Sequence, residues 1–391
     1  MRHVYSTITP AVVRRTAQAV LQQALPCKPY GRLVSVARLL GLLLLVAALR
    51  SSLSAVVRRF RFGFSHETAR KAVRANLPDA ATLTPLLVGA LHRLSGRLRR
   101  RRWVVAMDLH YQPFYGDRSA PGIVGGQKKQ GTNYFYGYAT AELVHRRHRY
   151  TVGLLAVEGK FKPHAVVAAL LAQLDEQGVP LRGVVLDSGF DSGETLLLLQ
   201  GRGLAYTVPL RRKGRGANRR NACFALPVGT VTTLDWVTEE RRRPVQTRVV
   251  VGRRPGESKV QVYAFGGWRP GRALAAAGAA VAARQARQWY RRRFGIETSY
   301  RQLHECQGRT TAKDQAYRLL LVGLALLLRQ VWVWLTGQLA RDRGARPTAW
   351  LAELPLQRLL DWLAEVLQRK YPEDKVIDLQ QPLDCPEGLH L

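Results

Sequence analysis

Cysteine, methionine and acidic residues are scarce in this chain of 391 residues. The four cysteines lie far apart with no close Cys-x-x-Cys pair, which argues against a zinc module or a disulfide framework and fits a reducing compartment. Long hydrophobic runs are missing too: segments 39–49 and 319–328 are shorter than the roughly 20 residues that span a bilayer, and we interpret both as buried helices. The first thirty residues carry dispersed arginines, which argues against a signal peptide. We therefore expect a cytoplasmic protein without a membrane partner.

Arginine is abundant, and the charge of the chain is strongly one-sided. Lysine and arginine total 61 against 27 aspartates and glutamates, which gives a formal net charge of +34. Such an excess suits a polyanionic partner, and DNA or RNA is the first candidate. The hydrophobic fraction of 47% excludes a disordered basic tail and indicates a globular protein with one large core or two to three smaller ones.

Residues 1–102 are predicted to form a helical DNA-binding region, in which segment 33–58 has the pattern of one long apolar helix. Segment 65–77 begins with the capping pattern Ser-His-Glu-Thr and resembles the recognition helix of a helix-turn-helix module. Its polar face offers Arg70, Lys71 and Arg74 to phosphates or base edges. An ordinary surface helix explains the same pattern equally well, so both interpretations stay open.

Residues 103–210 show strands and helices in the order β-β-β-α-β-α-β, which predicts an α/β core with a mixed sheet. The first strand, 103–108, and the fourth, 181–186, are apolar runs that lead to Asp108 and Asp187. The rest of the chain is predicted to contain a β-rich insertion at 211–270, the last core helices at 271–345, and a C-terminal helix and tail at 346–391.

A basic helix that contains aromatic residues is predicted from residue 282 onward, and Glu297 is the one acidic residue in its stretch 288–301. At about 3.6 residues per turn, four side chains share one face of this helix: Tyr290, Arg293, Glu297 and His304. A lone carboxylate among guanidinium groups is usually an ion-paired surface residue. The two upstream aspartates change this interpretation, because adjacent strands and a later helix can bring three carboxylates together.

Three converging carboxylates are costly unless a cation neutralises them, and hard oxygen ligands suit Mg²⁺ or Mn²⁺. Asp108, Asp187 and Glu297 are therefore the candidate catalytic residues and metal ligands. Two such ions about 3.5–4 Å apart can activate water or a 3′-hydroxyl on one side of a phosphodiester and stabilise the leaving oxygen on the other. Three nearby side chains are lesser candidates: His110, Asp117 and Asp191.

These residues resemble the DDE transposases of the insertion-sequence-four type, a bacterial and archaeal cut-and-paste group. Tyr290, Arg293 and Glu297 match most of the group's signature, Tyr-x2-Arg-x3-Glu-x6-Lys. The segments Val-Val-Ala-Met-Asp108 and Asp187-Ser-Gly-Phe resemble its first strand and the motif around its second aspartate. The resemblance covers residues 100–340 and implies a ribonuclease H-like core with a β-rich insertion, whose acidic triad holds two Mg²⁺ ions that Mn²⁺ can replace.

The resemblance also implies a function and partners. The protein would excise an insertion sequence at its terminal inverted repeats and join it to target DNA, as a homodimer in a synaptic complex, associated with the nucleoid of a prokaryotic cell. Tyr290 and Arg293 would hold a phosphate near the cleaved end. A flipped base at a hairpin end would stack on Trp268 or Trp236, with burial in the core as the competing interpretation of both tryptophans.

The chain departs from the signature at its last position, where His304 replaces lysine. A protonated histidine can still contact a phosphate, or Arg301 or Arg309 can fill the site. Two other functions stay open: a catalytically inactive, transposase-derived DNA-binding protein, and a metal-dependent DNA nuclease with the same core. The complete acidic triad counts against the first, and the arginine-rich N-terminal helices favour a transposase over the second.

Overall fold

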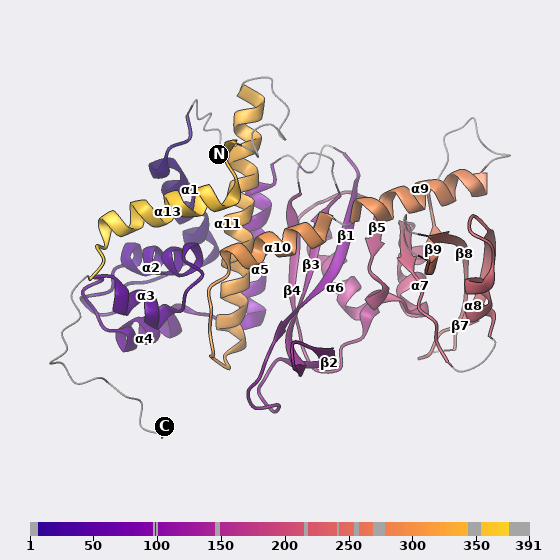
Figure 1. Ribbon diagram of the computed structural model, residues 1–391, viewed down its shortest axis with the longest axis horizontal. Helices are drawn as coiled ribbons and strands as arrows, with labels where there is room; N and C mark the ends of the chain where they lie inside the picture. The colour runs from indigo at the N-terminus through magenta and orange to yellow at the C-terminus, as the bar shows by residue number, and fades with distance from the viewer. Residues whose placement is uncertain are drawn as a thin grey trace.

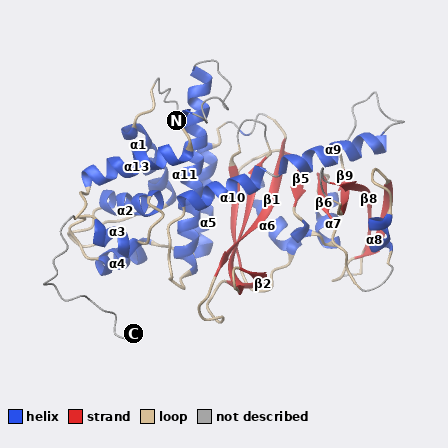
Figure 2. Cartoon of the chain, viewed as in Figure 1, coloured by secondary structure: helices blue, strands red, loops and turns tan. Residues whose placement is uncertain are grey.

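A mixed β-sheet lies at the centre of the molecule, with helices on both faces and a helical body at one end (Figures 1 and 2). The computed structural model describes residues 7–96, 98, 101–144, 149–214, 218–240, 242–253, 258–268, 278–293, 295–342 and 353–374. The strands are β1 (Trp103–Pro113), β2 (Ile123–Lys129), β3 (Thr132–Leu143), β4 (Thr151–Val157), β5 (Leu181–Leu186), β6 (Ala205–Pro209), β7 (Val231–Val237), β8 (Pro244–Arg253) and β9 (Val260–Gly266).

The strand order is β2-β3-β1-β5-β6-β9-β8-β7, and β4 pairs with β3 outside this path. β5 lies parallel to β1 and to β6, whereas β3 lies antiparallel to β1, β2 and β4. The predicted mixed sheet is confirmed, although β2 was not predicted as a strand. The predicted end of the first strand was wrong, because pairing with β3 carries β1 beyond Asp108 as far as Pro113.

Alternation along β1 gives the sheet two different faces. Val105 and Met107 belong to the core beneath α6 (Pro163–Glu176) and α7 (Gly193–Gly201), and Val104 belongs to the core beneath α9 (Gly278–Arg293). Because side chains alternate along a strand, Asp108 shares the face of Val104. The helix predicted from residue 282 corresponds to α9 and α10 (Gly295–Cys306), which lie on either side of residue 294, itself outside the described residues.

The helical body combines both ends of the chain around one apolar core. It contains α1 (Pro10–Ala24), α2 (Val36–Ala48), α3 (Leu53–Arg59), α4 (His66–Asn76), α5 (Ala80–Leu94), α11 (Gln315–Asp342) and α13 (Leu356–Lys370). The regions predicted separately at 1–102 and 346–391 thus pack together, and an ion pair of 2.7 Å joins Arg59 to Glu373. Parts of those regions, including residues 99, 100, 346–352 and 375–391, lie outside the described ranges.

The single long helix predicted at 33–58 was wrong, because α2 and α3 meet at an angle of 107°. Arg50 adopts a positive φ of 51° between them, and the Ser52 side chain accepts a hydrogen bond from the backbone N–H of Ala55, which begins a new helix. The capping pattern at Ser65 behaves as predicted, since its hydroxyl accepts from the backbone N–H of Thr68 at 3.1 Å and α4 follows.

The β-rich insertion extends the core sheet. β9 pairs antiparallel with β6, and β8 and β7 follow outward from β9. The inward-facing residues of β8 and β9, among them Val249, Val251 and Val262, are buried in the same core as β1 and β5. The short helix α8 (Arg219–Ala222) precedes these strands.

Residues 315–339 of α11 are long and apolar enough to cross a membrane by length and composition, as is the bent pair α2–α3 if it is counted as one span. The apolar part of α11 is wholly buried within the fold. A core helix of a soluble protein has the same properties, which agrees with the buried helix predicted at 319–328.

Candidate active site

Three structural elements deliver the three candidate carboxylates to one side of the sheet. In the parallel pair β1/β5, Met107 lies opposite Leu186, so Asp108 and Asp187 directly follow paired residues of neighbouring strands. β5 ends at Leu186, and Asp187 begins the short 3-10 helix η2 (Ser188–Phe190). The first turn of α10, which contacts β1, supplies Glu297.

The guanidinium group of Arg293 lies between these carboxylates. Its Nη1 is 3.0 Å from Oδ2 of Asp108, and its Nη2 is 3.4 Å from Oδ1 of Asp187 and 3.3 Å from Oε1 of Glu297. One buried cation at the end of α9 therefore contacts all three acids. The predicted convergence of the triad is present in the structure, with an arginine at its centre.

The three carboxylates differ in how deeply they are buried, and their electrostatic environments differ with it. The side chain of Asp108 is 13% exposed, against 35% for Asp187 and 52% for Glu297. Burial raises the pKa of Asp108 to about 7, Arg293 opposes that rise, and the negative charges of Asp187 and Glu297 add to it. Burial alone would lower the pKa of Arg293, but Tyr290 and the aspartates outweigh it and raise this pKa. Arg293 thus stays positively charged, whereas the negative charge around it changes with the protonation of Asp108.

The donor chemistry of the triad fits a hard divalent cation, because all three ligands are carboxylates. Within the described part of the chain, however, no group of three or more His, Cys, Asp or Glu side chains is arranged to hold a metal ion. The position of Arg293 explains why suitable ligands are not arranged as a metal site, since its guanidinium separates the carboxylates. A metal ion would have to displace this group.

The other two residues of the predicted helical face, Tyr290 and His304, differ in their exposure to solvent. Tyr290 is buried with 4% exposure, its ring 4.8 Å from that of Tyr263. His304 is exposed on α10, and its ring centre lies 5.0 Å from that of the buried His110. Partial desolvation of its ring, followed by the charge of Arg50, lowers the pKa of His304.

The three lesser candidates form no ion pair with the triad or with Arg293 among the described residues. Asp191 is buried, forms an ion pair of 2.9 Å with Arg220 and accepts from the backbone N–H of Arg211 at 2.8 Å, so its contacts are structural. Asp117 is exposed and accepts hydrogen bonds from the backbone and side chain of Ser119. His110 lies two residues after Asp108, and burial lowers its pKa to about 3.

Trp268 lies in the core, which does not support stacking on a flipped base. It is 4% exposed, and its indole N–H donates to the carbonyl of Tyr206 at 2.8 Å and lies 3.0 Å from the hydroxyl of Thr207. Trp236 is only partly buried on β7, with the guanidinium of Arg220 4.8 Å from its ring centre. Of the two tryptophans, Trp236 is the more accessible.

A basic cavity of about 820 Å³ lies between α3, α4 and the segment that joins α10 to α11. Its lining includes four cationic side chains: Arg70, Lys71, Arg74 and Arg309. The first three were predicted from the sequence as one helix face, whereas Arg309 joins them through the fold, its backbone N–H donating to the carbonyl of Ser51 at 3.0 Å. Arg301 is exposed on α10 and donates to Thr298.

Comparison with known proteins agrees with this geometry. The family described as the transposase DDE domain matches residues 99–328, which include β1, β5 and α10. The chain is also similar to the cryo-EM structure of a piggyBac transposase synaptic complex with hairpin DNA, with a TM-score of 0.52 and 11% identity over 95% of this chain and 83% of that chain. At this identity the similarity concerns the fold alone, and it confirms the predicted ribonuclease H-like architecture. No protein of curated function matches. Because the family match spans more than half of the sequence, the chain belongs to the transposase DDE domain family.

Proposed function

We propose that this transposase is of the insertion-sequence-four type and moves an insertion sequence by metal-dependent, cut-and-paste transposition. The observation that carries the proposal is the convergence of Asp108, Asp187 and Glu297 around one guanidinium group. The family match supports a transposase, and the spacing of Tyr290, Arg293 and Glu297 supports this type.

The three carboxylates would hold the divalent ions, Mg²⁺ or Mn²⁺, once Arg293 is displaced. When bound, such ions supply an activated water or 3′-hydroxyl and stabilise the leaving oxygen of a phosphodiester. The displaced guanidinium remains attached to the end of α9, beside the carboxylates, where a phosphate is its natural partner. Arg293 would therefore exchange three carboxylates for a phosphate of the cleaved DNA end.

Duplex DNA is the proposed partner, and the basic cavity beside α4 is its proposed contact away from the cleavage site. From Glu297 to Cys306 the axis of α10 measures roughly 14 Å at 1.5 Å per residue, which equals about four base-pair steps. Arg309 follows the end of this helix and lines the cavity. The end of an element could thus lie on the triad while its next few base pairs contact α4. The structurally similar piggyBac transposase complex is synaptic and contains hairpin DNA. This similarity supports three parts of the proposal: pairing of the two element ends, a homodimer, and excision through a DNA hairpin.

The test is cleavage of DNA that carries the ends of the element encoding this chain, with Mg²⁺ and with EDTA. Glu297→Gln removes one carboxylate charge from the triad. Glu305→Gln is the matched control, because it makes the same change further along α10. We expect metal-dependent cuts at the element ends for wild type and Glu305→Gln, and none for Glu297→Gln, with end binding equal in all three proteins.

The alternatives give different results in the same experiment. Binding of the ends without cleavage by wild type would indicate a catalytically inactive DNA-binding protein. Cleavage without joining of the freed 3′ end to a target plasmid would indicate a nuclease. Cleavage that survives in Glu297→Gln would refute the assignment of the triad.

A further inference from the structure

A second acidic residue of the core lies close to Asp108 on the same face of the sheet. In the antiparallel pair β1/β3, Asp108 lies opposite Thr140, and Ala106 lies opposite Glu142. Paired residues, and residues two apart on one strand, share a face. Glu142 therefore lies on the face that carries Asp108, beneath α10, but it is only 3% exposed.

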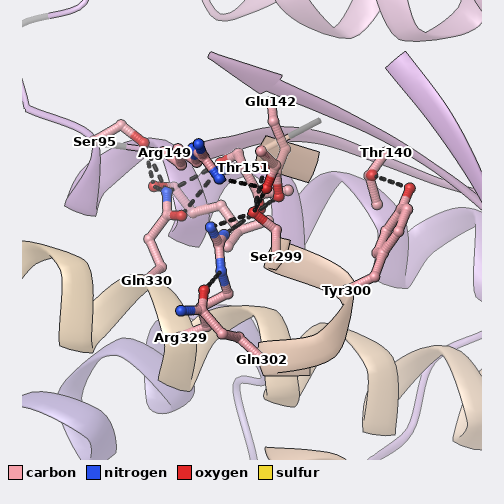
Figure 3. A network of polar contacts seen from close by, with 12 residues as sticks. Ser95, Thr140, Glu142, Arg149, Thr151, Ser299, Tyr300, Gln302, Arg329 and Gln330 are labelled. Atoms are coloured by element: carbon pink, nitrogen blue, oxygen red, sulfur yellow. Dashed lines mark hydrogen bonds and ion pairs between the residues drawn. The ribbon is translucent and has the colours of Figure 1, made fainter. Parts of the chain in front are cut away.

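Glu142 binds the helix that carries Glu297 (Figure 3). Its Oε2 accepts a hydrogen bond of 2.7 Å from the hydroxyl of Ser299, two residues after Glu297 on α10. Its Oε1 accepts from the hydroxyl of Thr151 at 3.1 Å and forms an ion pair of 3.3 Å with Arg329 of α11. Arg329 is 1% exposed, so both charges are sealed from solvent.

Arg329 also contacts α10 directly. Its Nη2 donates to the hydroxyl of Ser299, and its Nε donates to the side-chain oxygen of Gln302 at 3.1 Å. The neighbouring residue of α11, Gln330, accepts from the backbone N–H of Thr151 and donates to the carbonyl of Leu91. α11 is thereby fixed to β4 and α5, so Arg329 holds α10 from a rigid position.

A separate contact fixes α10 next to the active site. The hydroxyl of Tyr300 lies 2.7 Å from that of Thr140, the residue opposite Asp108. The ring of Tyr300 stacks on that of His110 with a centroid distance of 5.0 Å. Residues 299 and 300 are thus both anchored to the sheet, immediately after the turn that carries Glu297.

We propose that Glu142 and Arg329, joined through Ser299, are positioning residues for Glu297. They fix the position of α10 on the sheet, and this position determines the distance between the Glu297 carboxylate and Asp108. Glu297 itself is half exposed, and among the described residues its ion pair is with Arg293, so contacts within the triad alone hold it weakly. This inference rests on the proposed function, because it assumes that Glu297 is a metal ligand.

The test measures Mn²⁺ binding to the DNA-free protein by electron paramagnetic resonance, in a double-mutant cycle of Ser299→Ala and Glu297→Gln. Ser299→Ala removes the hydroxyl that joins α10 to the ion pair and leaves both charges in place. We expect it to weaken Mn²⁺ binding by about 3- to 10-fold, in line with the loss of a hydrogen bond, and to have no further effect when Glu297 is already glutamine. Glu142→Gln should show the same dependence with a larger loss.

The control is Thr336→Val, which removes a buried hydroxyl of α11 that, among the described residues, bonds to carbonyls of its own helix. It should leave Mn²⁺ binding unchanged. Equal losses from Ser299→Ala in the presence and absence of Glu297 would overturn the inference, as would wild-type affinity in Ser299→Ala. If Mn²⁺ binding to wild type does not depend on Glu297 at all, the proposed function fails and the inference fails with it.

Discussion

Replacing Arg293 with glutamine should make the DNA-free protein bind Mn²⁺ more tightly. The guanidinium of Arg293 contacts all three carboxylates at 3.0 to 3.4 Å, so a metal ion held by all three would have to displace it. Glutamine removes the competing cation and leaves the carboxylates in place. This expectation is opposite to the usual loss of function when an active-site arginine is removed.

The magnitude depends mainly on the contact with Asp108. Asp187 and Glu297 are 35% and 52% exposed, so solvent screens their ion pairs with Arg293 and these add little. The contact at 3.0 Å between the buried Arg293 and Asp108 is a charge-assisted hydrogen bond, for which about 1.5–3 kcal/mol is typical. Since 1.36 kcal/mol corresponds to a factor of ten, Mn²⁺ affinity should increase by roughly 10- to 100-fold.

The assay is a Mn²⁺ titration at pH 8.5 in anaerobic buffer. This pH is needed because the pKa of Asp108 is already about 7, and loss of Arg293, which opposes the rise, will raise it further. Arg292→Gln is the matched control: it removes the same charge one residue earlier, where the guanidinium lies 4.7 Å from the ring centre of Trp289. Affinity for Arg293→Gln that is no higher than for Arg292→Gln would refute the displacement of Arg293 by metal.

Three further predictions follow from the same structure. Mn²⁺ affinity of the wild type should fall by about tenfold per pH unit below 7, because Asp108 must lose its proton to bind the ion, and a flat binding profile would contradict the assignment. The raised pKa of Asp108 also affects stability. Relative to Asp108→Asn, the free energy of unfolding should decrease by roughly 1.4 kcal/mol per pH unit as pH rises from about 4 to 7, and should be constant above pH 7. Replacing Arg70 and Lys71 together with glutamine should weaken DNA binding and reduce the slope of log Kd against log salt concentration by about 0.9 per lost phosphate contact. The control Arg358→Gln on α13 should change neither the affinity nor the slope. Equal effects of the two replacements would argue against the cavity as the DNA contact. Trp268→Ala should lower the free energy of unfolding by roughly 3–5 kcal/mol in chemical denaturation, since the side chain is buried and hydrogen-bonded, and a loss of less than about 1 kcal/mol would contradict a core role.

Local patterns in the sequence were sufficient to predict which acidic residues converge at the candidate site. An apolar run that leads to an acidic residue predicted Asp108 and Asp187, and helical spacing predicted that Arg293 and Glu297 lie close together, as their contact of 3.3 Å shows. Both patterns depend only on neighbours in the chain. The position of Arg293 between the acids depends on the distance between α9 and two strands, which no local pattern contains.

Long-range pairing decided the features that the sequence did not predict. β1 extends beyond Asp108 because β3 pairs with it to the end, and α1 and α13 share a core although they lie at opposite ends of the chain. Glu142 and Arg329 did leave a signal, since each is a lone charge inside an apolar run. A lone charge indicates that a buried partner exists, but the identity of that partner follows only from the fold.

The two pairs of buried charges on this face of the sheet are suited to different tasks. The Arg329–Glu142 pair is 1% and 3% exposed, and Ser299, Thr151 and Gln302 bind its remaining polar atoms. Breaking such a pair would leave an unpaired charge in the core, so it is a permanent structural contact. Arg293 contacts acids that become progressively more exposed, from Asp108 to Glu297, so the proposed replacement by an incoming cation would start from the solvent side. Under the proposed function, a fixed pair beneath an exchangeable one would allow the helix that carries Glu297 to keep its place while the partner of its carboxylate changes.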